Sequence, residues 1–166
     1  MATFIAIPIL SGLMILQSGI ISRIPLLQGT PDLLMLFILG WAMQKRVQTA
    51  WQWCIIGALI FGLASALPLG TPLLGYGLAT GVALLLRRQL WQIPLLAMLV
   101  AVLVGTFANH AISLIALRLV GNPIPIPQAL NLITLPSAFL NLIFAIPAFA
   151  MMGDLANWLY PEALEA

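Results

Sequence analysis

Residues 62–88 read GLASALPLGTPLLGYGLATGVALLLRR, and this stretch decides the fold class. Two apolar runs flank a turn that contains Pro68, Gly70 and Pro72, and no charged residue occurs before the last two positions. The flanks have no polar face to present to water, so the turn cannot be a surface loop of a water-soluble domain. The stretch predicts a helical hairpin inside a membrane.

The composition extends this conclusion to the whole chain. Of its 166 residues, 63% are hydrophobic and 6% are charged, whereas soluble domains carry roughly 25% charged residues. We therefore predict an all-α integral membrane protein with a single membrane domain, residues 1–166. The six lysines and arginines are dispersed and form no basic patch, so we expect no nucleic-acid partner. The single Cys54 excludes an intramolecular disulfide.

Apolar runs separated by charges, prolines and glycines predict a bundle of six transmembrane helices. Their expected ranges are about 3–22, 31–43, 51–67, 72–86, 94–117 and 134–152. The second and fourth, at roughly 20 to 22 Å, are shorter than a bilayer core of about 30 Å. Thr30 and Thr71 each precede a proline, which favours them as helix-capping residues.

Basic residues and tryptophans predict the orientation. With six spans, Lys45-Arg46 and Arg87-Arg88 fall on the side of both termini, and Arg23 and Arg118 fall on the other. The positive-inside rule then predicts cytoplasmic termini. The tryptophans are expected at that same interface, and they are Trp41, Trp51, Trp53, Trp91 and Trp158. We expect residues 121–131 to be extended, and residues 153–166 to form an amphipathic tail.

Polar residues gather on one face of the fifth predicted helix. Thr106, Asn109, His110 and Ser113 follow the spacing i, i+3, i+4, i+7. The first and sixth helices add similar residues, and the candidate polar pocket comprises Gln17, Asn109, His110, Ser113 and Asn141. Two interpretations stay open, namely a ligand pocket and hydrogen bonding between helices.

His110 is the only histidine, and the sequence offers no acid within the spans as a proton-relay partner. Its alternatives are a neutral, hydrogen-bonded imidazole and a proton carrier. Ser65 and His110 could supply the nucleophile and the base of a serine hydrolase, but no oxyanion-hole donors are recognisable. We therefore expect no enzymatic activity, no cofactor and no metal site.

Glycines in the hairpin permit close helix approach. Gly77 and Gly81 form a GxxxG pair, which serves either internal packing or the docking of a partner helix.

Short motifs spread along most of the chain resemble the MreD family of rod shape-determining proteins. They are Leu16-Gln17-Ser18, Pro31-Asp32-Leu33-Leu34, Ser65 with Leu69-Gly70 and Tyr76, and Leu140-Asn141-Leu142. The resemblance implies a fold similar to the S-components of energy-coupling-factor vitamin transporters. It also implies a multi-pass protein of the bacterial cytoplasmic (inner) membrane.

By this resemblance, the chain is expected to be a non-enzymatic scaffold that binds MreC. Through that complex it would reach an elongation-class penicillin-binding protein, RodA and MreB. Candidate helix-packing or partner contacts are Asp32, Gly70, Tyr76, Gly77 and Gly81. The alternative is an S-component-like subunit that binds a vitamin or another small molecule. The family typically has an aspartate where this chain has Gly62.

Overall fold

The computed structural model describes residues 2–19, 29–65, 67–90 and 92–161. These residues form helices and no strand, as the sequence predicts. The helices are α1 (Ala2–Gly19), α2 (Leu33–Ala42), α3 (Ala50–Ala64), α4 (Gly70–Gln89), α5 (Pro94–Leu119), α6 (Ile126–Gln128) and α7 (Leu135–Leu159). A π-helical segment, η2 (Ala129–Thr134), joins α6 to α7. Arg23 and Trp91, to which the sequence assigns topological roles, lie outside the described residues.

Within the described residues, three helices are long and apolar enough to cross a membrane, which indicates a membrane protein. They are α1, α5 and the continuous helix from Ile126 to Leu159. In contrast, α2 has only 10 residues and α3 has 15, about 15 and 22 Å at 1.5 Å per residue. The 20-residue α4 carries four glycines, two threonines and two terminal arginines, which lower its hydropathy. The helix lengths therefore do not support six full-length spans.

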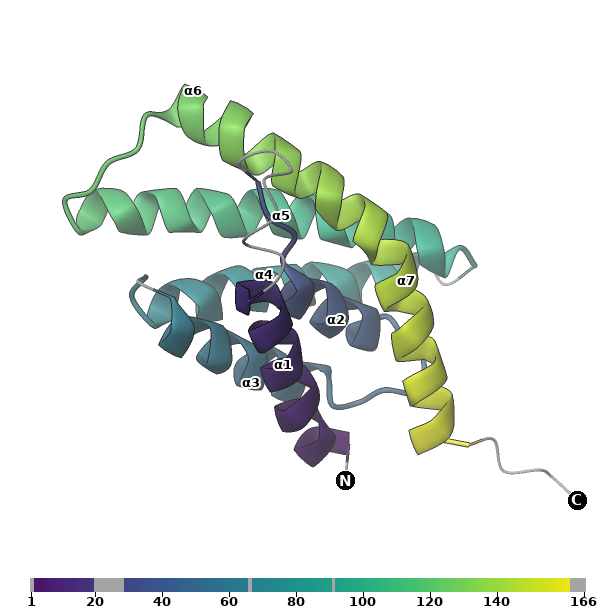
Figure 1. The fold of residues 1–166 in the computed structure, drawn as a ribbon. Helices are drawn as coiled ribbons and strands as arrows, with labels where there is room; N and C mark the ends of the chain where they lie inside the picture. The colour runs from purple at the N-terminus through teal and green to yellow at the C-terminus, as the bar shows by residue number, and fades with distance from the viewer. Residues whose placement is uncertain (1, 20–28, 66, 91, 162–166) are drawn as a thin grey trace, which may run out of the picture.

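The short helix α2 forms the centre of the bundle (Figure 1). All of its ten residues are buried, and it contacts α1, α3, α4, α5 and α7. An apolar helix shorter than the bilayer requires protein around its ends, because lipid cannot satisfy free backbone groups. The surrounding helices supply that environment.

The hairpin of α4 and α5 is held by small residues. Gly75, Ala79 and Ala83 recur every four residues on α4, and all three are buried. A Cβ atom built at Gly105 of α5 would lie 2.9 Å from the Ala79 Cβ. Small side chains let two helix backbones approach this closely.

The helix ends differ from the predicted ones. Asp32, not Thr30, caps α2, since its carboxylate accepts the Met35 N–H at 3.0 Å. α4 begins at Gly70, before the predicted capping residue Thr71.

The last helix begins at Ile126 rather than at 134, and it continues to Leu159 instead of ending at 152. Pro136 has no N–H to donate to the carbonyl four residues earlier. The wider turn of η2 directly precedes it and accommodates that missing bond. Only residues 121–125 of the predicted extended linker lie outside a helix.

Two of the tryptophans that were expected at the membrane interface belong to the core. Trp41 and Trp53 are fully buried and stack with ring centroids 4.5 Å apart. Their indole N–H groups donate to Thr49 Oγ1 and to the Ala2 carbonyl, both at 3.1 Å. Trp51 and Trp158 are exposed, as an interfacial position requires.

Candidate functional site

The N-terminus of α2 lies inside the bundle, so its free N–H groups need partners from the protein. Side chains from other helices supply them. Leu33 N donates to Gln17 Oε1 of α1 at 2.8 Å, and Asp32 N donates to Asn141 Oδ1 of α7 at 2.7 Å. Gln17 and Asn141, from distant parts of the sequence, thus form with Asp32 a polar shell around the start of the short helix.

The Asp32 carboxylate occupies the middle of this shell. Its Oδ1 accepts the Tyr76 hydroxyl at 2.7 Å in addition to the Met35 N–H. Its Oδ2 is 3.5 Å from Asn109 Nδ2, at the limit of a hydrogen bond. Within the described ranges, no lysine or arginine forms an ion pair with it. The carboxylate therefore has one well-bonded oxygen and one oxygen with free lone pairs.

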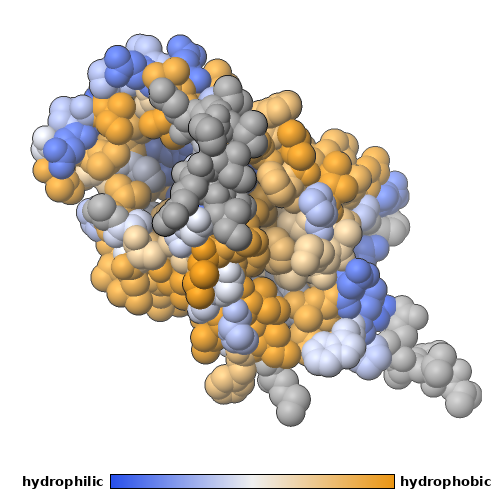
Figure 2. Space-filling model, viewed as in Figure 1, coloured by the Kyte–Doolittle hydropathy of each residue, from blue (hydrophilic) through white to orange (hydrophobic). Residues whose placement is uncertain are grey.

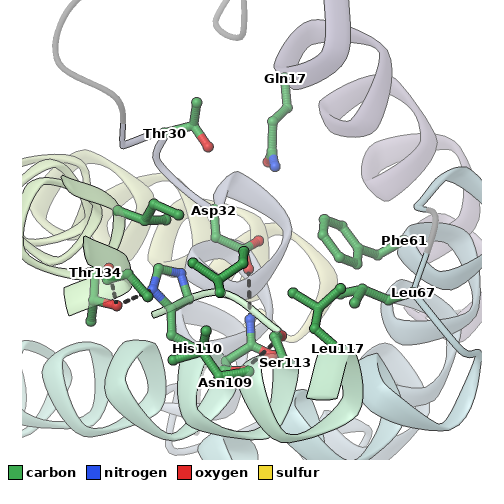
Figure 3. Close-up of a pocket in the computed structure, with 14 residues that line it drawn as sticks. Gln17, Thr30, Asp32, Phe61, Leu67, Asn109, His110, Ser113, Leu117 and Thr134 are labelled. Carbon is green, nitrogen blue, oxygen red and sulfur yellow. Dashed lines mark hydrogen bonds between the residues drawn. The ribbon is translucent and has the colours of Figure 1, made fainter. Parts of the chain in front are cut away.

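A cavity of about 220 Å³ adjoins this carboxylate. Figure 3 shows Asp32 near its centre, with His110, Asn109 and Ser113 on α5 below it and Gln17 and Thr30 above. Phe61 and Leu67 lie on one side and Thr134 on the other. The remaining lining residues are Leu114, Leu117, Ile124, Ala129 and Ile133. The cavity thus has a few polar groups set in an apolar wall, which is typical of small-molecule sites.

The contacts of His110 assign its tautomer. Its Nδ1 lies 3.1 Å from Thr134 Oγ1, and the Thr134 hydroxyl donates to the Ala129 carbonyl at 3.2 Å. A hydroxyl has one proton, so when Thr134 donates it to the Ala129 carbonyl, Thr134 accepts from Nδ1–H. In the neutral ring Nε2 is then the hydrogen-bond acceptor. The contact supplies the hydrogen bond to a neighbouring hydroxyl that the neutral-imidazole interpretation requires.

Four of the five residues of the predicted pocket line the cavity: Gln17, Asn109, His110 and Ser113. Asn141 does not, because its side chain is used in the protein's own packing. Its Nδ2 donates to Thr106 Oγ1 at 2.9 Å while its Oδ1 holds Asp32 N.

The expectation that His110 has no acid within the membrane domain is wrong, since Asp32 lines the same cavity. The sequence names Asp32 and Tyr76 as candidate helix-packing or partner contacts, and in the structure the two residues share a hydrogen bond in the polar shell. A signal existed in the sequence: Asp32 is the only acidic residue before Asp154.

Two of the chemical possibilities raised by the sequence are a metal site and a Ser65–His110 pair. In the part of the chain that the structure describes, no three His, Cys, Asp or Glu side chains are grouped to hold a metal ion. Ser65, the candidate nucleophile, ends α3, and its Oγ accepts the Leu67 N–H at 3.3 Å. It does not line the cavity with His110.

A second concave surface lies on the outside of α4. This groove of about 490 Å³ is lined by Trp51, Gly77, Leu78, Gly81, Val82, Leu84, Leu85 and Arg88. A Cβ built at Gly77 would meet no atom within 4 Å, and one at Gly81 would meet only the Trp51 ring at 3.7 Å. Internal packing therefore does not require glycine at either position.

Gly70 is another residue named for packing or partner contact, and a Cβ built there would also meet no atom within 4 Å. Gly62, where the resembled family has an aspartate, is tightly packed. A Cβ there would lie 2.9 Å from Leu69 Cδ2 and 3.7 Å from Pro72 Cγ. An aspartate at this position would displace the Leu69 side chain.

No protein-family profile, curated protein or solved structure matches this chain. The chemistry of the cavity and the shape of the groove are therefore the basis for assigning a function.

Proposed function

We propose that this protein is a non-enzymatic membrane scaffold of the cell-elongation complex, and that it binds the membrane-spanning part of MreC in the groove outside α4. The observation that carries the proposal is the pair Gly77 and Gly81, which lines an open groove without serving internal packing. The MreD-like motifs supply the identity of the partner.

One face of α4 packs inside the bundle, and in this proposal the other face binds the partner. Gly75, Ala79 and Ala83 face α5, and a Cβ at Gly75 would overlap the Asn109 side chain. Gly77 and Gly81 lie on another face, next to the exposed side chains of Leu78 and Leu85. Small residues flanked by leucines suit a second helix in lipid, where association depends on close packing. An apolar helix of MreC has the chemistry to occupy such a groove.

The proposal includes six helical crossings with both termini in the cytoplasm, in a bacterial inner membrane. The start of α1 and the end of α7 lie toward the same side in Figure 1. Arg46 Nη1 donates to the Tyr160 carbonyl at 3.0 Å, which joins the basic α2–α3 loop to the end of α7. Figure 2 has an orange hydrophobic band between hydrophilic residues near the α5–α6 turn and near the end of α7. The basic end would face the cytoplasm.

Co-purification of MreC with groove variants tests the proposal. Isoleucine at Gly77 or Gly81 should reduce the MreC retained, because a branched side chain fills the groove. Isoleucine at Gly12 of α1 is the matched control, since a Cβ there also meets no atom within 4 Å. His110→Gln should reduce MreC binding less than either groove variant. Equal retention of MreC by all of these variants would refute the proposal.

The cavity at the α2 N-terminus favours a second candidate function, capture of a small molecule in the manner of an S-component. Helices that end inside a membrane protein and expose polar groups to a cavity are common at transporter binding sites. The observation in its favour is that Gln17, Asn109, His110 and Ser113 all line a cavity instead of only packing helices. Mass spectrometry of the denatured pure protein tests it, since a retained ligand would appear in stoichiometric amount.

A further inference from the structure

We propose that the cavity beside Asp32 binds a small molecule with a primary ammonium group and a compact apolar body. This inference rests on the second candidate function and names its ligand class. It is independent of the scaffold role, because the groove outside α4 and the cavity share no lining residue.

The first argument is charge. Among the described residues that line the cavity, Asp32 is the only acidic one, and none is a lysine or arginine. An isolated carboxylate at membrane depth is costly, so such groups pair with an opposite charge or serve transport and binding. The hydrogen bonds from Tyr76 and Met35 satisfy Oδ1 but bring no positive charge. A cationic ligand would neutralise the carboxylate through Oδ2.

The second argument is the direction of the hydrogen bonds. The Ser113 hydroxyl gives its proton to the Asn109 carbonyl at 2.8 Å, so its oxygen can only accept from a ligand. When the Thr134 proton goes to the Ala129 carbonyl, Nδ1 of the neutral His110 ring carries the ring proton and Nε2 is an acceptor. Asp32 Oδ2 is an acceptor as well. These three acceptors belong to residues that line the same cavity, and an ammonium group has three N–H donors.

The third argument is the shape and polarity of the wall. A cavity of about 220 Å³ equals roughly seven water molecules at about 30 Å³ each, which limits the ligand to a small molecule. Phe61, Leu114 and Leu117 contribute apolar surface for its body. The Phe61 ring also offers an aromatic face, which attracts cations.

Calorimetric titration of the purified full chain with benzylamine tests the inference, with benzyl alcohol as the uncharged probe of equal shape. Benzylamine is expected to bind saturably, and benzyl alcohol at least about tenfold more weakly, because hydrogen bonds to charged groups are about twice as strong as neutral ones. Asp32→Asn keeps the capping oxygen and removes the charge, so it should weaken benzylamine binding by a similar factor of about ten.

A second pair of variants keeps the test decisive if Asp32→Asn does not fold. Leu117→Trp fills the cavity from α5 and should abolish benzylamine binding. Ile115→Trp is its control, since Ile115 is on the same helix but 59% exposed. Equal binding of benzyl alcohol and benzylamine, or unchanged benzylamine binding by Leu117→Trp, would overturn the ammonium assignment alone. No saturable binding of either probe would overturn it and also remove the support for small-molecule capture.

Discussion

The hydroxyl of Tyr76 donates a 2.7 Å hydrogen bond to Oδ1 of Asp32, and so connects the first half of α4 to the N-cap of α2. The two residues are 44 positions apart in the sequence. Their contact explains how a ten-residue helix can begin inside the bundle. The carboxylate caps α2, and α4 fixes the carboxylate.

Loss of this hydroxyl should destabilise the bundle. Tyr76→Phe leaves the ring in place against Phe61, with centroids 5.7 Å apart in the parent protein. It removes a buried hydrogen bond to a carboxylate, which costs roughly 1.5–3 kcal/mol. Thermal unfolding in detergent should show a lower Tm. Tyr160→Phe is the control and should leave Tm nearly unchanged; an equal loss in both variants would argue against a special role of Tyr76.

Replacement of Asn141 should be more damaging than replacement of an exposed asparagine on the same helix. Asn141→Ala removes the acceptor of Asp32 N and the donor to Thr106. Each buried group left without its partner costs about 1–3 kcal/mol. Asn131→Ala removes the same side chain from an exposed position. The Tm of the two variants should therefore differ clearly, and similar values would contradict the role assigned to Asn141.

Arg87 should hold the α2–α3 loop in place. Its Nη1 donates to the carbonyls of Ala42, Gln44 and Val47 at 2.9, 2.9 and 3.2 Å. Arg87→Gln cannot reproduce this set, so hydrogen exchange in residues 43–49 should accelerate. Arg88→Gln, at the exposed neighbouring position, should leave exchange there unchanged. Identical exchange in both variants would show that the loop does not depend on Arg87.

The two faces of α4 should respond differently to added volume. Ala79→Leu places a larger side chain against Gly105 and should destabilise the bundle by about 1–3 kcal/mol. Gly81→Leu adds volume only to the groove and replaces a poor helix former, which favours the helix by up to about 1 kcal/mol. Tm measurements on the protein without its partner distinguish them. A large loss of stability in Gly81→Leu would place that residue in internal packing.

The sequence predicts part of this site, and the reason is helical periodicity. Asn109, His110 and Ser113 share a face by spacing alone, and the structure brings that face to the cavity. Periodicity cannot say which residue on another helix meets that face. Asn141 has the same polar character, but it is used by the backbone of Asp32, 109 positions away.

The sequence also does not determine which of the two small-residue faces of α4 packs inside the bundle. Gly77 and Gly81 have the GxxxG spacing, but Gly75, Ala79 and Ala83 have an equivalent small-residue spacing and form the contact with α5. Judged by composition alone, either face could pack against another helix of the bundle. Which one does so depends on where α5 returns after residues 90–93, and no local preference determines that.

Photo-crosslinking in cells that co-express MreC tests the central claim most directly. A photoreactive amino acid is placed at Leu78 or Leu85 in the groove, where the side chains are 55% and 59% exposed. The comparison positions are Ile115 on α5 and Phe139 on α7, with matched exposures of 59% and 61%. We predict crosslinks to MreC from Leu78 and Leu85 and none from Ile115 and Phe139. Crosslinks from the comparison positions with none from the groove would contradict the account.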